Sequence, residues 1–239
     1  MASRWRSVLG GCLLGILVVA PALAAAPAAD ESGFVVLTGQ DGRAHWLGYG
    51  LDDAKDSWPA SWELVDGVLH AKGGSVDLKT REQFGDFDLR FEWKIPAGAN
   101  SGVMYRVSQE ADPAYYTGPE YQIVDNVGTE DGANPDTSAA SLYALYAPTK
   151  DATKPAGEWN EARIVIDANH VEHYLNGEKV VDYELGSDDW NRRVAASKFA
   201  EWKKFGKNQR GHVVLQDHGY DVWYRNVRIK SLDGAAQGN

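Results

Sequence analysis

An acid, an amide and a second acid follow one another in the stretch PEYQIVDN, residues 119–126. If this stretch is a strand, side-chain alternation places Glu120 and Gln122 on one face, and Asp125 joins them only where a bulge adds a residue. With such a bulge, Glu120 and Asp125 have the residue types for retaining glycoside hydrolysis, in which two carboxylates about 5 to 5.5 Å apart act as nucleophile and acid. The alternative is that they are only the solvated side of a sheet.

A second group of polar residues lies in GHVVLQDHGYDVWYRNVRI, residues 211–229. On a strand, Gln216 and His218 share one face, and His218 followed by a glycine stands at a rim where a ligand and solvent meet. The alternative for His218 is a hydrogen-bonded surface residue. His170 and His173 have a metal-ligand spacing only on a helix, and their segment is predicted as a strand, so they are expected to point to opposite faces.

A third candidate is the segment GANSGVMYR, residues 98–106. Strand parity places Asn100, Gly102, Met104 and Arg106 on one face, so a guanidinium is predicted beside whatever that face binds. Arg106 then either clamps a ligand, stabilises a developing oxyanion, or pairs with Glu120 on a neighbouring strand. No phosphate-binding loop and no G-x-S-x-G nucleophile motif occurs in the sequence.

The elements that must position these side chains are predicted to be strands. In DFDLRFEWKI, residues 86–95, apolar and charged residues alternate strictly. Asp66-Gly67 and Asn176-Gly177 each separate two apolar runs, as in tight hairpins. Helix signals are restricted to a turn near residues 142–146 and a short piece at 196–205. The pattern predicts an all-β jelly-roll sandwich of two antiparallel sheets with one or two short helices.

The N-terminal segment has the features of an export signal. Residues 1–24 of the 239-residue chain combine Arg4 and Arg6 with an apolar run and small residues before a cleavage point near Ala24. We expect a periplasmic or secreted protein without a membrane span after processing; a lipoprotein cleaved before Cys12 is the less favoured alternative. Residues 25–32 and 233–239 are expected to be flexible ends of one domain, residues 33–232.

The composition of the processed chain excludes several classes of function. Cys12 is the only cysteine, so disulfides, a thiol nucleophile and cysteine-based zinc sites are excluded after cleavage. Loss of Arg4 and Arg6 changes the formal charge from -10 to -12, because 24 basic residues become 22 against 34 acidic ones. Nucleic acid is not an expected partner, since binding to phosphates requires a basic face.

Several of these segments together resemble the 3-keto-disaccharide hydrolase domain family, long catalogued as a domain of unknown function. The segments are NSGVMYR, PEYQIVD, GEWNEARIVI, VEHYLNGEKVVDY, SKF and GHVVLQDHGYDVWYRNVRI. The resemblance extends from about Gly33 to Leu232. The opening VVLTGQDGRAHWLGYG departs from the pattern usual in the family, Leu-Phe-Asn-Gly-Lys-Asp-Leu-x-x-Trp, at the first rim loop.

The resemblance implies a concanavalin-like jelly roll, export, and cleavage of glycosides already oxidised to a ketone at C3. Such a ketone acidifies the C2 proton, so a base removes it, the C1 substituent leaves, and water then adds. This chemistry needs no nucleophilic carboxylate, which suits the amide at Gln122. It also implies a link to a sugar 3-dehydrogenase that supplies the substrate.

Roles for individual residues follow from the resemblance. Either His218 or Glu120 is the base at C2, and the other carries a proton to the leaving oxygen. Arg106 would polarise the ketone or stabilise the enolate. A divalent cation held by His218 with Glu120 or Asp125 is an alternative to Arg106. The expected substrate-binding residues are Gln122, Gln216, Asp125, Asn100, Tyr143, Trp159 and Lys198.

Two other functions compete with the elimination chemistry. A noncatalytic carbohydrate-binding module would bind sugars on the concave face of a jelly roll with its aromatic side chains, and the chain has 9 Trp and 11 Tyr. An ordinary glycoside hydrolase would use Glu120 and Asp125. The three differ in geometry, because only the first requires Glu120, Gln122, Arg106 and His218 to meet in one pocket.

Overall fold

The computed structural model describes Met1 and residues 31–55, 58–110 and 113–233. The proposed leader at residues 1–24, Cys12 included, therefore lies outside the described residues except for Met1. The same holds for most of the two proposed flexible ends, residues 25–30 and 234–239. From Gly33 onward the described residues form one compact unit.

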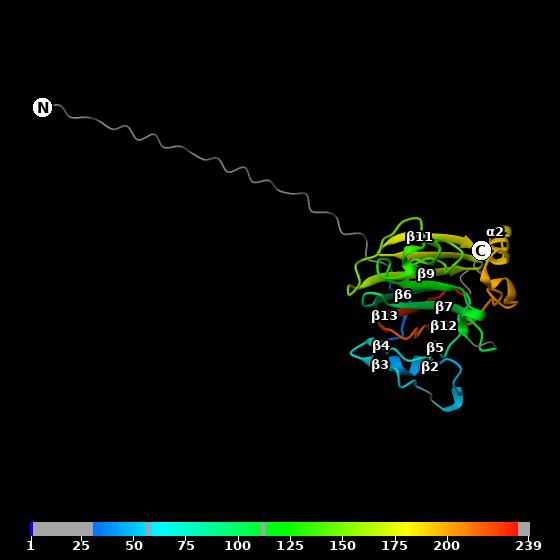
Figure 1. The fold of residues 1–239 in the computed structure, drawn as a ribbon. Helices are drawn as coiled ribbons and strands as arrows, with labels where there is room; N and C mark the ends of the chain where they lie inside the picture. The colour runs from blue at the N-terminus through cyan, green and yellow to red at the C-terminus, as the bar shows by residue number, and fades with distance from the viewer. Residues whose placement is uncertain (2–30, 56–57, 111–112, 234–239) are drawn as a thin grey trace. The chain divides into compact units, whose positions relative to one another are not determined.

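The described strands of this unit form two antiparallel sheets (Figure 1). The larger sheet has the order β11-β10-β9-β6-β13-β4-β3, and β1 pairs with β13. Its strands are β1 (Val35–Val36), β3 (Trp62–Val65), β4 (Val68–Lys72), β6 (Phe87–Lys94), β9 (Asn160–Asp167), β10 (His170–Leu175), β11 (Glu178–Glu184) and β13 (Asp221–Ser231). The smaller sheet has the order β2-β5-β12-β7-β8. Its strands are β2 (Trp46–Gly48), β5 (Leu78–Thr80), β7 (Asn100–Val107), β8 (Glu120–Val124) and β12 (His212–Leu215).

The core between the sheets is formed by the apolar residues of alternating strands. Phe87, Leu89, Phe91 and Trp93 of β6 are all buried, as the alternation predicts. Tyr121 and Ile123 of β8, Val103 of β7, and Val213 and Leu215 of β12 meet them from the smaller sheet. The alternate residues of β7, β8 and β12 therefore lie on the face of the smaller sheet that is turned away from the core.

Both predicted hairpins are present. Asp66 and Gly67 join β3 to β4 with φ values of 50° and 76°, and Asn176 and Gly177 join β10 to β11 with 50° and 84°. Positive φ at both turn residues matches the twist of the flanking strands, and Asn, Asp and Gly adopt it most easily. The two-sheet, all-β fold expected from the sequence is confirmed.

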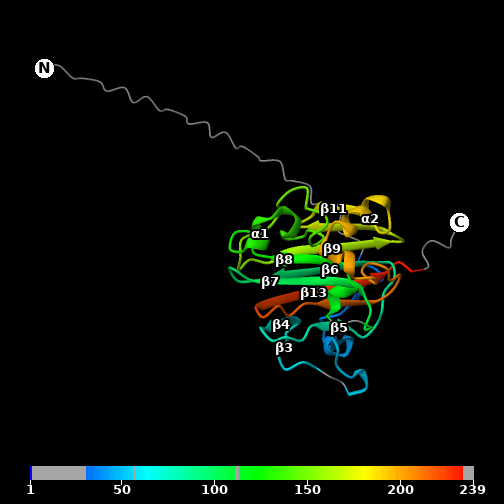
Figure 2. The ribbon, with the colours of Figure 1, turned by 45° about the vertical axis from the view of Figure 1, so that its right-hand side comes forward.

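The described helices are short and lie between strands. They are α1 (Glu130–Ala133), α2 (Asp188–Ala195) and the 3-10 helices η1 (Gly42–His45), η2 (Asp53–Lys55), η3 (Ala114–Tyr116), η4 (Pro135–Thr137) and η5 (Lys198–Glu201). Helix α1 comes after β8 along the chain (Figure 2). The segment between them is fixed to the end of β8 because the Thr129 hydroxyl donates a hydrogen bond to the Asp125 carbonyl oxygen, 2.9 Å away. Among the described residues, no helix has both the length and the apolar character that crossing a lipid bilayer requires.

Candidate active site

A cavity of about 270 Å³ opens on the face of the smaller sheet that is turned away from the core. Its floor is a row across three strands, because Gln122 of β8 is the register partner of Gly102 of β7, and the Gln216 N–H, just beyond β12, donates to the Gly102 carbonyl oxygen at 2.9 Å. We call it the Glu120 cavity; it is lined by Asn100, Tyr115, Glu120, Gln122, Asp131, Tyr143, Lys198, Phe199, Trp202, Gln216 and His218.

The cavity brings together most of the site residues predicted from the sequence. Seven of them line it, namely Asn100, Glu120, Gln122, Tyr143, Lys198, Gln216 and His218. Sequence reasoning missed Asp131 of α1, Tyr115 of η3, and Phe199 and Trp202 beside Lys198. Three of the missed residues stand on short helices and Trp202 directly follows one, so the period-two pattern that located the floor gives no signal for them.

Glu120 lies over the backbone of β7 where that strand has no side chain. A Cβ added to Gly102 would come within 1.9 Å of the Glu120 Oε1 atom. Glycine at position 102 therefore provides the space for this carboxyl group. Burial raises the pKa of Glu120 to about 8, opposed by the attraction of Lys198 and reinforced by the negative charges of Asp77 and Asp131.

Lys198 provides a cation in the wall of the Glu120 cavity. Its Nζ lies 4.3 Å from the centre of the Tyr143 ring, and the Ser197 hydroxyl caps the start of η5 by accepting the Phe199 N–H. Burial lowers the pKa of Lys198, while attraction to Glu120 and Asp131 opposes that shift. Burial, together with the negative charges of Asp131 and Glu120, raises the pKa of the Tyr143 hydroxyl to about 12, so this hydroxyl stays a neutral donor.

Two buried amides form the polar floor. Gln122 is 1% exposed and Gln216 is 7% exposed. The Nε2 atom of Gln122 and the Oε1 atom of Gln216 have no hydrogen-bond partner among the described residues. Buried polar groups are nearly always paired, so these two atoms, one from each amide, are the candidates in the floor to hydrogen-bond a ligand. An amide rotated about its last torsion offers either a donor or an acceptor to such a ligand.

His218 stands at the rim of the Glu120 cavity, as expected. Its side chain is exposed, and its ring stacks on Tyr220 with 6.2 Å between centroids and 7° between planes. The next residue, Gly219, has a φ of 87°, which turns the chain sharply after β12. The imidazole is therefore placed between the cavity and solvent.

Arg106 is not part of this cavity, contrary to the expectation from strand parity. His212 and Val214 of β12 pair with Val107 and Met104 of β7, so β7 carries one extra residue in a bulge, and Arg106 has a φ of 50°. The buried guanidinium instead donates to segments that adjoin strands of the larger sheet: Nε to the Gly85 carbonyl at 3.0 Å, and Nη2 to the Asp86 carboxylate at 2.9 Å and the Ala168 carbonyl at 2.8 Å.

Asp125 also lies elsewhere. The pairing of β8 with β7 has no register shift, so the bulge that would have turned Asp125 toward Glu120 is absent from these strands. Its carboxylate accepts the N–H groups of Gly98 at 2.8 Å and Val127 at 3.1 Å and lines a separate cavity. Burial raises the pKa of Asp125, but these backbone hydrogen bonds outweigh it and hold the pKa below its usual value.

Trp159 is likewise outside the Glu120 cavity. The Lys94 ammonium and the Arg225 guanidinium lie 5.1 Å and 4.1 Å from the centre of its ring. Both cations come from strands of the larger sheet, β6 and β13, at positions that alternate with core residues. Trp159 therefore packs on the outer face of the larger sheet.

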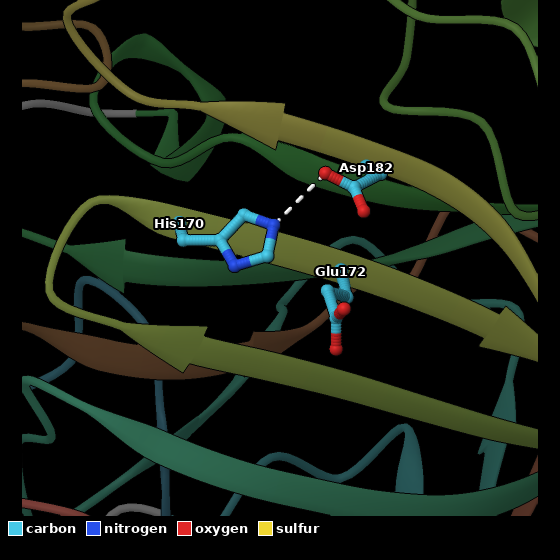
Figure 3. Close-up of side chains that lie close together, drawn as sticks. All are labelled: His170, Glu172 and Asp182. Carbon is cyan, nitrogen blue, oxygen red and sulfur yellow. Dashed lines mark hydrogen bonds and ion pairs between the residues drawn. The ribbon is translucent and has the colours of Figure 1, made fainter.

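Of the two carboxylates considered as partners of His218 for a divalent cation, Glu120 lines the same cavity as His218 and Asp125 lines a separate one. A different group, His170, Glu172 and Asp182, has ligand atoms within 4.8 Å of one another on β10 and β11 (Figure 3). Lys179 donates to Glu172 at 2.9 Å and to Asp182 at 2.6 Å. The Lys179 ammonium thus already pairs with both acids, and His170 pairs with Asp182, so we assign the group to a surface ion-pair network.

His170 and His173 point to opposite faces, as their strand spacing predicts. His170 is exposed and pairs with Asp182. His173 is fully buried, where its Nδ1 donates to the Ala140 carbonyl oxygen at 3.0 Å and its Nε2 lies 3.0 Å from the Tyr105 hydroxyl. The buried ring supports the loop that runs along the edge of β8, because the Ala140 N–H donates to the Gln122 carbonyl oxygen.

The wall that carries Lys198 rests on a column of aromatic rings. Adjacent rings lie 4.1 to 5.9 Å apart between centroids, and none of the four pairs is inclined by more than 20°. The column consists of Tyr146, Tyr183, Trp190, Phe205 and Phe199. Because Phe199 directly follows Lys198, the column fixes the backbone of η5.

Comparisons with known proteins agree with this fold. A curated 3-keto-disaccharide hydrolase of Bacteroides thetaiotaomicron is 35% identical, over 85% of this chain and 80% of the relative. Two solved structures from Parabacteroides distasonis, to which glycosyl hydrolase activity has been attributed, are also similar. The first has a TM-score of 0.75 and 32% identity over 84% of this chain and 94% of its own. The second has a TM-score of 0.65 and 26% identity over 83% and 99%.

The sequence profile of the 3-keto-alpha-glucoside-1,2-lyase-like domain matches residues 33–230. This range spans both sheets from β1 almost to the end of β13 and includes every residue that lines the Glu120 cavity. With the profile and the relative from Bacteroides in agreement, this chain belongs to the family of 3-keto-alpha-glucoside-1,2-lyase-like domains.

Proposed function

We propose that this protein is an exported enzyme that cleaves 3-keto disaccharides by elimination followed by hydration. The observation that carries the proposal is the convergence of Glu120, Lys198, His218 and two unpaired amides on one cavity, with the pKa of Glu120 raised to about 8. Strongly perturbed carboxyl groups in clefts are frequent at catalytic sites. Membership of the family and the substrate named for the Bacteroides relative support the choice of a 3-keto sugar.

Glu120 is the base that removes the C2 proton in the proposed reaction. A carboxylate with a raised pKa is a stronger base than an ordinary one, and its ionised fraction grows as the pH approaches about 8. Negative charge then develops on the C3 oxygen, and the Lys198 ammonium takes the stabilising role first expected of Arg106. Gln122, Gln216, Asn100 and the neutral Tyr143 hydroxyl hold the sugar hydroxyls.

The bond to the leaving sugar breaks as the C2 proton departs. The electron pair of the C2–H bond forms a double bond between C1 and C2, and the pair of the C1–O bond goes to the leaving oxygen, which takes a proton from His218. Addition of water across the double bond then gives the free 3-keto sugar. After the elimination Glu120 is protonated and His218 has lost its proton. During hydration Glu120 returns its proton to C2, and His218 takes the proton released by the water that adds to C1.

The two competing functions fit the geometry less well. An ordinary retaining glycoside hydrolase needs two carboxyl groups about 5 to 5.5 Å apart that both act on the same glycosidic bond. Glu120 and Asp125 instead line separate cavities. A noncatalytic carbohydrate-binding module does not require a half-buried carboxyl group with a raised pKa, because the desolvation of such a group is unfavourable.

Turnover of matched substrates and variants tests the proposal. The wild-type enzyme is expected to cleave a 3-keto disaccharide and not its unoxidised parent. Glu120→Gln and His218→Ala should each lower kcat by roughly 10² to 10⁴, the usual contribution of a general acid or base. Asp125→Asn is the matched control and should retain wild-type turnover. Cleavage of the parent sugar, or equal losses in all three variants, would contradict elimination at Glu120.

We also propose that the enzyme acts in the periplasm or outside the cell. The N-terminal leader supports this location, and the oxidised substrate requires a sugar 3-dehydrogenase to supply it. The mass of the protein purified from the native host distinguishes cleavage near Ala24 from lipidation at Cys12. A full-length chain would contradict export.

A further inference from the structure

A second cavity, of about 670 Å³, adjoins the Glu120 cavity. We call it the side trough; besides the three residues that it shares with the Glu120 cavity, its walls include Tyr49, Gly50, Leu51, Ser75, Asp77 and Asp217. The shared residues are Tyr115, Gln216 and His218. The two cavities thus adjoin, and His218, which lines both, stands at the junction between them.

The acids of the side trough are occupied by backbone hydrogen bonds. The Asp217 carboxylate accepts the Gly74 N–H at 3.0 and 2.9 Å and the Gly219 N–H at 3.2 Å. Asp77 accepts the Asp217 N–H at 2.9 Å. These contacts tie the segment before β5 to the segment after β12 and hold the walls of the trough in place. The acids of the side trough are therefore engaged in holding its walls, whereas the groups suited to proton transfer lie in the Glu120 cavity and at the junction.

We propose that the side trough binds the leaving sugar, while the 3-keto ring occupies the Glu120 cavity and the scissile oxygen lies beside His218. This assignment rests on the proposed function. It follows from the order of the groups: the C2 proton belongs to the 3-keto ring and must face Glu120, and the leaving oxygen is the atom that joins the two rings. His218, at the boundary, then protonates that oxygen as its bond to C1 breaks.

The chemistry of the walls defines the class of leaving group. Ser75 is exposed and Leu51 is 38% exposed, so the trough presents a polar and an apolar side chain to a ligand. Asp77 and Asp217 add negative charge to the walls. A neutral hexose is therefore favoured as the leaving group, and a phosphorylated or uronic sugar is disfavoured by repulsion between like charges.

A bulky side chain in the side trough separates this proposal from the proposed function. Ser75→Trp should lower kcat/KM for a 3-keto disaccharide with glucose as its leaving sugar by at least about tenfold, equivalent to ~1.4 kcal/mol of binding. For the corresponding methyl 3-keto-glucoside, whose leaving group is too small to fill the trough, kcat/KM should stay within about twofold. Thr149→Trp, an exposed control that lines neither cavity, should change neither value.

The outcomes are distinct for the two proposals. Failure of the wild-type enzyme to cleave either oxidised substrate would overturn the proposed function. If the wild-type enzyme cleaves both and Ser75→Trp reduces both equally, or reduces neither, only the assignment of the side trough is overturned. A loss confined to the disaccharide, with circular dichroism and Tm matching the Thr149→Trp control, supports it.

Discussion

Glu120, the base of the proposed reaction, has a pKa shift that opposes stability at neutral and higher pH. Its pKa is about 8 in the folded protein against 4.5 for an ordinary glutamate, so the folded state binds this proton more tightly than the unfolded chain does. The contribution of the group to the free energy of unfolding is therefore fully present below pH 4.5 and is lost as the pH rises from 4.5 through about 8. Glu120→Gln removes this titration.

We expect Glu120→Gln to be more stable than the wild type at pH 8.5 and close to it at pH 4. Each ~1 kcal/mol gained corresponds to a rise in Tm of about 2 to 4 °C in a domain of this size. Calorimetry of both proteins at the two pH values measures the difference. An identical change in Tm at both pH values would show that Glu120 does not carry the shifted pKa.

At the scale of the element, β7 makes room for the carboxyl group of β8. Gly102→Ala places a methyl group where Glu120 Oε1 lies, so the carboxyl must move away. Because the carboxyl group is the far end of the flexible Glu120 side chain, it can move away with little strain, and we expect a small change in Tm. We expect kcat to fall by about 10- to 100-fold, in line with the effect of misplacing a catalytic group by about 1 Å.

Gly39→Ala is the matched control for this substitution. Its added Cβ meets only Val36 side-chain atoms, at 3.5 and 3.9 Å, which are ordinary contacts. Steady-state kinetics and thermal unfolding of both variants complete the comparison. Wild-type kcat in Gly102→Ala would mean that Glu120 does not need its observed position.

The elements also show which structural features can be predicted from a sequence. Alternation placed Glu120 and Gln122 correctly on one face, and the Asp66-Gly67 turn is a local signal that fixed its hairpin. The bulge at Arg106 has no such signal, because a non-glycine residue with positive φ is held there by the pairing of β7 with β12. Asp131 lines the cavity because α1 folds back beside the end of β8. That placement depends on tertiary contacts, which a local sequence pattern does not show.

At the scale of the whole domain, Arg106 ties the smaller sheet to the larger one. We expect Arg106→Met to lower the free energy of unfolding by about 3 kcal/mol, because Asp86 loses its partner and two carbonyl groups lose donors. The kcat/KM of the folded variant should stay within about twofold of wild type, since Arg106 lines neither cavity. Urea unfolding and steady-state kinetics measure the two effects.

Arg210→Met provides the corresponding control at the surface. Arg210 pairs with Asp233, but its side chain is 56% exposed, so its loss should reduce the free energy of unfolding by less than ~1 kcal/mol. A large fall in kcat/KM for Arg106→Met without a loss of stability would restore the catalytic role first inferred from strand parity.

The aromatic column beneath Lys198 affects how much ordering of the protein the binding of a substrate requires. Rings stacked from Tyr146 to Phe199 leave the backbone of η5 little freedom to lose, so association costs little ordering of the protein on that side. Encounter should then be limited by diffusion and by stripping hydration water from the sugar, rather than by closure of a lid. We therefore expect sugars at low concentration to bind to a site that is already formed in the free protein.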